Sequence, residues 1–271
     1  MIQGVKMRTK IIVILTIVLL SAFVGCKRKA DTMPSPETTA AITTYAPLPT
    51  FKEVFRVLDQ LQAKDISAAI PTKLYKTKQE EVRNAFSLGL LTADATLAAK
   101  GHNKNKLSDI SSAMMNLTTL LGLESEVNQM GADLKTLIEK EQWQELESTL
   151  DAHKKKVEDK LWEMESYDNY ILMLMGGWVE AANRVAWLLK QNYSAEKTKV
   201  LDQKGTFNSL IGNLKNIKAE HIKGQPAFQE SIGLMEQIKA VIDTDKDKTY
   251  TAEQLDQIIN LTEQVKAAFQ K

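Results

Sequence analysis

The chain has 271 residues, of which 44% are hydrophobic and 25% are charged, and its formal net charge is +1. This near-neutral balance argues against a nucleic-acid-binding protein, which would carry a basic face. A single cysteine excludes an intramolecular disulfide, so the stability must come from a packed hydrophobic core.

The first 25 residues have the layout of an export signal. Three basic residues and no acidic one precede an apolar run at Ile11–Leu20, and small residues then lead to Cys26. The run is short for the roughly 20 residues that span a bilayer, which favours cleavage over the alternative of an uncleaved anchor. Removing residues 1–25 leaves 32 basic and 34 acidic residues, a formal charge of −2.

The segment around Cys26 resembles the bacterial lipobox, in which the cysteine is linked to diacylglycerol and becomes the mature N-terminus. Phe23 departs from the Leu that is usual three positions earlier, but it is also large and apolar. Each buried acyl CH₂ contributes about 0.8 kcal/mol, so two or three chains give a stable anchor. Lys27 stands where inner-membrane lipoproteins carry a retention aspartate. We therefore expect a lipid on Cys26 and an address in the bacterial envelope, at the outer rather than the inner membrane.

Residues 26–49 contain four prolines and five threonines, a composition typical of an extended spacer. We expect this segment to be a tether between the anchor and a single all-helical domain at residues 50–271.

Helical periodicity runs through that domain, and alternating β-branched stretches are nearly absent. Long helices joined by short loops predict an all-α fold, an irregular antiparallel bundle of about eight or nine helices. A capping box at Thr251–Gln254 marks one helix start. The expected helices are an apolar stripe from Phe51 to Leu61 and helices over roughly Thr77–Lys100, Leu107–Leu121, Glu124–Glu139, Gln142–Met164, Ser166–Gln191, Ser194–Ile222, Pro226–Asp243 and Ala252–Phe269.

The segment Tyr170–Val179 is apolar on all sides, which predicts a helix that is buried all round but too short to span a membrane. Gly176 and Gly177 lie inside it, and each costs about 1 kcal/mol relative to Ala in a helix. One interpretation is a close helix–helix approach, with Trp178 packing alongside. The other is that the missing side chains make room for a ligand.

Three polar residues are candidates for a ligand site or for a structural polar cluster. Glu180 and Arg184 are four residues apart, in the favourable order for an ion pair. Asp94 lies in an otherwise apolar run, where a buried carboxylate needs a partner. Arg184 is our candidate for that partner.

The segment Phe86–Asp94, followed by a helix pair and then by Gly176–Glu180, resembles a family of all-helical bacterial lipoproteins with a GGWxE motif. The similarity covers about Phe51–Leu214. It implies an all-α fold and an envelope address, and it implies no activity. By this resemblance, Asp94 and Glu180 are the residues to examine first.

Motifs for catalysis are missing. His102, His153 and His221 have no second ligand at metal spacing, and we find no phosphate loop, nucleophile elbow or HExxH motif. The anchor uses Cys26, so no thiol nucleophile remains. We therefore expect that the protein is not an enzyme, and that it has no catalytic residue, no metal and no cofactor other than the lipid.

One loop weakly resembles the start of an EF-hand calcium site. Lys248 replaces the glycine at position 6, and Glu253 is one place too early for the bidentate ligand. The alternative is a polar loop capped by Thr251. The candidate calcium ligands are Asp243, Asp245, Asp247 and Glu253.

These patterns favour a membrane-anchored envelope lipoprotein with a non-catalytic helical binding or scaffold domain. Its expected partners are the membrane, through the lipid, and a protein of the envelope, with no nucleic acid. The alternative is a small-ligand-binding lipoprotein with a pocket near Gly176, Gly177 and Trp178. An exposed apolar patch would favour the first function, and an open pocket would favour the second.

Overall fold

The computed structural model describes residues 55, 58–59, 62–72, 80–243 and 248–270. The chain divides into two units, Met1–Thr39 and Ala40–Lys271, and all the described residues belong to the second. The expected export signal, Cys26 and the tether at residues 26–49 lie outside the described residues.

Every element of the described chain is helical, so the predicted all-α bundle is confirmed. None of the described helices has the length and apolar character needed to cross a membrane. The first half contains α4 (Ala63–Ser67), α5 (Glu81–Lys100), α6 (Lys104–Leu120), α7 (Glu124–Glu139), α8 (Trp143–Glu163) and α9 (Tyr167–Gln191). The second half contains α10 (Ala195–Thr198), the 3₁₀ turn η2 (Lys199–Leu201), α11 (Lys204–Asn216), α12 (Glu220–Lys223), α13 (Pro226–Asp243) and α14 (Ala252–Gln270).

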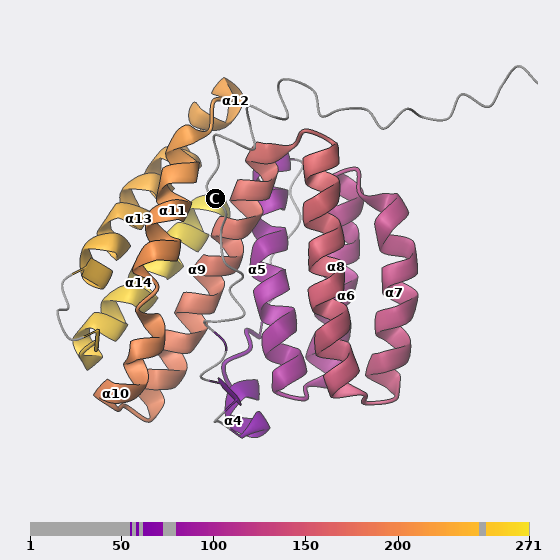
Figure 1. The fold of residues 1–271 in the computed structure, drawn as a ribbon, viewed down its shortest axis with the longest axis horizontal. Helices are drawn as coiled ribbons and strands as arrows, with labels where there is room; N and C mark the ends of the chain where they lie inside the picture. Colours follow the sequence, from indigo (N-terminus) through magenta and orange to yellow (C-terminus); the bar gives the residue numbers. More distant parts are fainter. Residues whose placement is uncertain (1–54, 56–57, 60–61, 73–79, 244–247, 271) are drawn as a thin grey trace, which may run out of the picture. The chain divides into compact units, whose positions relative to one another are not determined.

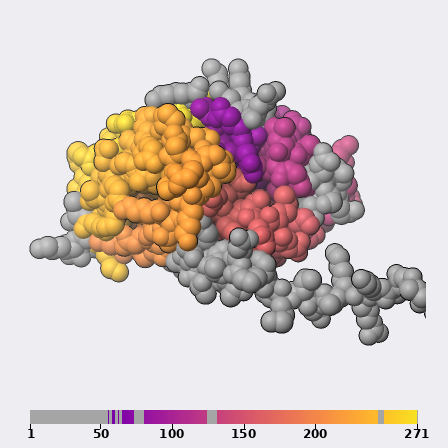
Figure 2. Space-filling view, turned by 90° about the horizontal axis from the view of Figure 1, so that it is seen from above, coloured from indigo at the N-terminus to yellow at the C-terminus, as the bar shows by residue number. Residues whose placement is uncertain are grey.

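Helices α5 and α9 lie side by side at the centre and form the most extensive helix contact of the described chain. On one side α6 packs on α5, α7 packs on α6 and α8 packs on α7, and α8 also contacts both α5 and α9. On the other side α14 packs on α9 and α13, and α11 packs on α13. Figure 2 shows the same division from above, with the residues after α9 (orange to yellow) on one side and the α6–α8 region (magenta to red) on the other. Helix α9 is therefore shared by the two groups.

The five consecutive helices from α5 to α9 are joined by four loops of three residues each, and all four loops have the same backbone structure. The middle residue of each loop has a positive φ: His102 (51°), Gly122 (75°), Glu141 (54°) and Glu165 (57°). The third residue donates its backbone N–H to the carbonyl five positions earlier, as Ser166 does to Leu161 at 2.8 Å. This is the Schellman motif, which satisfies the free carbonyls at the end of a helix. The repeated turn makes consecutive helices antiparallel neighbours.

The predicted helix over Ser194–Ile222 is wrong, because the segment is divided into α10, η2, α11 and α12. At the first break, the buried Thr198 hydroxyl donates to Ala195 O at 2.6 Å and accepts from the Tyr250 backbone N–H at 2.7 Å. At the second break, Ile217 has an extended backbone (ψ 123°) and is buried. Both breaks come from contacts that the local periodicity does not contain.

The capping box at the start of α14 is confirmed. The Thr251 backbone N–H donates to Gln254 Oε1 at 2.8 Å, and the Gln254 N–H donates to Thr251 Oγ1 at 3.2 Å. Of the expected stripe at Phe51–Leu61, Phe55 and Leu58 are described and fully buried.

Candidate functional site

The central helices approach each other closely enough to exclude side chains at two glycines. A Cβ on Gly176 of α9 would lie 2.1 Å from the carbonyl oxygen of Phe86 in α5, and one on Gly89 would lie 1.9 Å from that of Met173. Both neighbours are backbone atoms, which cannot move aside as a side chain can. Glycine is the residue that permits such an approach. The interpretation of Gly176–Gly177 as a helix contact is therefore supported, and the space that the ligand interpretation needed is filled by α5.

Trp178 also packs against protein. Its ring lies 4.2 Å from that of Phe207 in α11, centroid to centroid. The pocket beside it has a volume of about 10 Å³, close to the space that one water molecule needs. The pocket that Trp178 lines therefore has room for about one water molecule.

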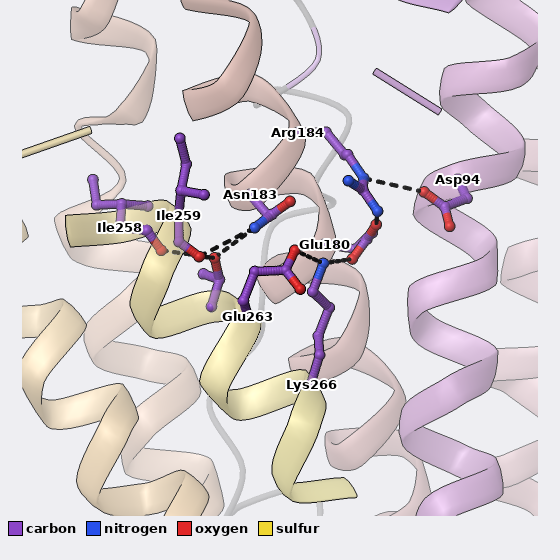
Figure 3. A network of polar contacts seen from close by, with 9 residues as sticks. Asp94, Glu180, Asn183, Arg184, Ile258, Ile259, Glu263 and Lys266 are labelled. Atoms are coloured by element: carbon purple, nitrogen blue, oxygen red, sulfur yellow. Dashed lines mark hydrogen bonds and ion pairs between the residues drawn. The ribbon is translucent and has the colours of Figure 1, made fainter. Parts of the chain in front are cut away.

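About one helical turn after Gly176, α9 presents a buried carboxylate to two basic side chains (Figure 3). Glu180 pairs through Oε1 with the Arg184 guanidinium on the same helix. Its Oε2 accepts a hydrogen bond from Lys266 Nζ of α14 at 2.9 Å. The Lys266 amine also lies 2.6 Å from Glu263 Oε1, which is near the surface. The ion pair that the spacing of Glu180 and Arg184 predicted is therefore present.

Asp94 of α5 faces this group from the other side, and the partner expected for it is present. Its Oδ1 lies 3.7 Å from Nε of Arg184, which is longer than a hydrogen bond, and its side chain is fully buried. Figure 3 shows the guanidinium between the two carboxylates. The structure therefore brings Asp94, Glu180 and Arg184 together, and it adds Lys266.

The pKa values of the two carboxyl groups shift in opposite directions. For Asp94, loss of solvent and the charge of Glu180 raise the pKa well above its usual value, and Arg184 opposes them only in part. For Glu180, burial acts to raise the pKa, but the charges of Lys266 and Arg184 outweigh it, and the pKa is lowered. The raised pKa favours the neutral form of Asp94, which limits the negative charge buried beside Arg184 and Lys266.

A second set of hydrogen bonds continues along the contact of α9 with α14. Asn183 Nδ2 donates to Thr262 Oγ1 at 2.9 Å and to the carbonyl of Ile259 at 3.3 Å. The Thr262 hydroxyl donates in turn to Ile258 O at 2.7 Å. The polar face of α9 is thus matched by polar groups on α14.

Sequence reasoning missed Lys266, Asn183 and Thr262. A signal for Lys266 exists, because it is one residue after the buried Val265 and three before the buried Phe269, on the apolar face of α14. A lysine at such a position is rarely fully buried without a partner. The pattern does not name that partner, which lies 86 residues away.

The calcium candidate remains a prediction. Asp245 and Asp247 lie outside the described residues, and Asp243 pairs with Lys239 on α13. Lys248 has a φ of 60°, so it adopts the left-handed backbone that a glycine would favour, and its Nζ lies 3.2 Å from Asp202 Oδ2. Among the described residues, no three or more His, Cys, Asp or Glu side chains are grouped so that they could hold a metal ion.

Comparison with family models, curated proteins and solved structures finds no match to this chain. Asp94 and Glu180 are enclosed on all sides, and their partners come from α5, α9 and α14. This arrangement joins three helices and shields both carboxylates from solvent.

Proposed function

We propose that the protein is a lipid-anchored lipoprotein of the bacterial envelope whose helical body is a non-catalytic binding or scaffold domain. The observation that carries the anchor is in the sequence: basic residues, a short apolar run and small residues lead directly to Cys26, the only cysteine. The spacer at residues 26–49 would hold the body away from the bilayer.

The geometry of the polar cluster supports the non-catalytic part of the proposal. A general acid or base must come within hydrogen-bond distance of a substrate. Asp94 and Glu180 are both 0% exposed, and the groups around them are themselves paired. The candidate residues thus have the surroundings of a structural cluster.

Exposed apolar side chains support a protein partner. Leu120, at the end of α6, is 52% exposed, and Met164, after α8, is 40% exposed. A Cβ on Gly122 would lie 3.6 Å from the Met164 methyl group, which places Met164 at the same end of the bundle as Leu120. Apolar residues gathered on a surface often mark a protein contact.

The anchor is tested by labelling cells with a palmitate analogue. We expect the wild-type chain to carry the label and to fractionate with membranes, and we expect Cys26→Ser to lose both. A serine variant that is still acylated would contradict the anchor.

The partner is tested with a photo-crosslinking residue in the acylated protein in intact cells. Position 120 should give a discrete adduct that Cys26→Ser weakens, and the exposed Gln237 on α13 is the control position. Equal adducts at both positions would argue against a specific binding face.

A further inference from the structure

An apolar pocket of about 60 Å³ lies among α5, α6, α7 and α8 and reaches α9. It is several times larger than the roughly 10–15 Å³ that one water needs. None of the charged cluster residues lines it. Its walls include Leu88, Met114, Met115, Leu134, His153 and Met173.

Most polar groups of this pocket are already satisfied. The Thr92 hydroxyl donates to Leu88 O at 2.7 Å, and the Thr118 hydroxyl donates to Met114 O at 2.8 Å. Lys154 pairs with Glu158 on the same helix. Two atoms differ: Ser111 Oγ and His153 Nδ1 are buried and have no hydrogen-bond partner within the described part of the chain.

His153 is only 6% exposed, so an unpartnered ring nitrogen there is costly. Burial, and then the charge of Lys156, lower the pKa of His153, which favours the neutral ring. Its Nε2 lies 4.0 Å from Asp133 Oδ2, which is longer than a hydrogen bond, but the negative charge of this carboxylate favours the proton on the nearer ring nitrogen. Nδ1 is then a bare acceptor, which requires a donor.

We propose that this pocket binds a small, mainly apolar molecule with one hydroxyl group, which donates to Nδ1 of His153. The apolar body would lie against Met114, Met115 and Met173, because methionine side chains adapt to irregular shapes. Ser111 can orient the same hydroxyl, since its own can donate or accept. A phenol has the right size and chemistry. This site goes beyond the proposed function and depends on neither the anchor nor a protein partner.

The test uses the full chain with Cys26→Ser, which removes the acyl chains, and with ¹³C-labelled methionine methyl groups. p-Cresol and toluene are the two probes, since they differ only in the hydroxyl. We expect saturable shifts of the Met114, Met115 and Met173 methyl signals. Both compounds should bind, but only p-cresol should depend on His153.

Two variants isolate the hydrogen bond from the pocket itself. His153→Leu should weaken p-cresol relative to toluene about tenfold, or about 1.4 kcal/mol. His153→Phe serves the same purpose if the leucine variant does not fold. Gly131→Leu should block both probes, because a Cβ there already meets the Met115 sulfur at 3.0 Å. This glycine lies within α7, so leucine also favours the helix.

Three results would overturn the proposal. One is the lack of any saturable shift with p-cresol. Another is a p-cresol-to-toluene ratio that His153→Leu leaves unchanged. The third is tight binding of Ag⁺ to the same methionine and histidine side chains without p-cresol binding, which would assign a soft-metal site instead.

Discussion

Lys266 of α14 and Glu180 of α9 form an ion pair at 2.9 Å in which neither side chain is more than 3% exposed. Such a pair need not be worth more than two apolar side chains, but removing one partner leaves the other charge buried. Because Arg184 extends the cluster to Asp94, the pair links α14 through α9 to α5. The stability of the central helices should therefore depend strongly on each member.

Replacing Lys266 by Met should lower the free energy of unfolding by about 3–5 kcal/mol, as is typical when a buried pair is broken. Urea unfolding followed by circular dichroism measures this. Lys190→Met is the matched control, since Lys190 pairs with Asp256 at 2.5 Å on the surface. That change should cost at most about 1 kcal/mol. Equal losses in the two variants would mean that the burial of Lys266 is not important for stability.

Asp94→Asn should change how stability depends on pH. A carboxyl group whose pKa is raised on folding stabilises the protein fully below its unfolded pKa, and this contribution is lost as pH rises toward the folded pKa. Asparagine does not titrate. The stability of the variant relative to wild type should therefore increase as pH rises from about 4, the usual aspartate pKa.

Melting temperatures of both proteins across this pH range test the expectation, with the exposed Asp109→Asn as a control. A difference between wild type and Asp94→Asn that stays flat with pH would show that Asp94 has an ordinary pKa. The lowered pKa of Glu180 acts in the opposite sense, because its contribution is lost as pH falls. Glu180 is present in both proteins, so the difference between them reports the titration of Asp94 together with its effect on Glu180.

Gly176→Ala should be strongly destabilising, because its Cβ would lie 2.1 Å from a backbone oxygen of α5. Overpacking of a well-packed core typically costs about 1–3 kcal/mol, and a backbone neighbour places this site at the upper end. Gly233→Ala in α13 is the control, since a Cβ there meets nothing within 4 Å. It should stabilise the protein by up to about 1 kcal/mol through helix propensity alone. Similar melting temperatures for both variants would contradict the close contact of α5 with α9.

Glu165→Gly should stabilise the loop between α8 and α9. Its φ of 57° is unfavourable for a side chain with a Cβ, by roughly 1–2 kcal/mol. Part of the gain is offset because glycine is more flexible in the unfolded chain. The net change in chemical unfolding should be a gain of up to about 1 kcal/mol.

Gln237→Gly, at an exposed position inside α13, provides the comparison and should lose about 1 kcal/mol. If both substitutions destabilise the protein equally, the left-handed backbone at Glu165 is absent in solution.

The sequence alone determined the helical class and most helix bounds, because helix periodicity, glycine at Gly122 and the capping box at Thr251 act within a few residues. It also suggested Asp94, Glu180 and Arg184 as a group. It could not show that Glu141 and Glu165 take the same left-handed turn as Gly122, since neither residue type signals it.

The tertiary structure decided the rest. The break at Thr198 depends on a hydrogen bond to Tyr250, 52 residues away, and Lys266 finds its carboxylate 86 residues away. Whether Gly176 makes room for a ligand or for a helix depends on how closely α5 approaches. These outcomes are long-range because burial and charge compensation are properties of the packed core, where each group is satisfied by whichever neighbour the fold brings to it.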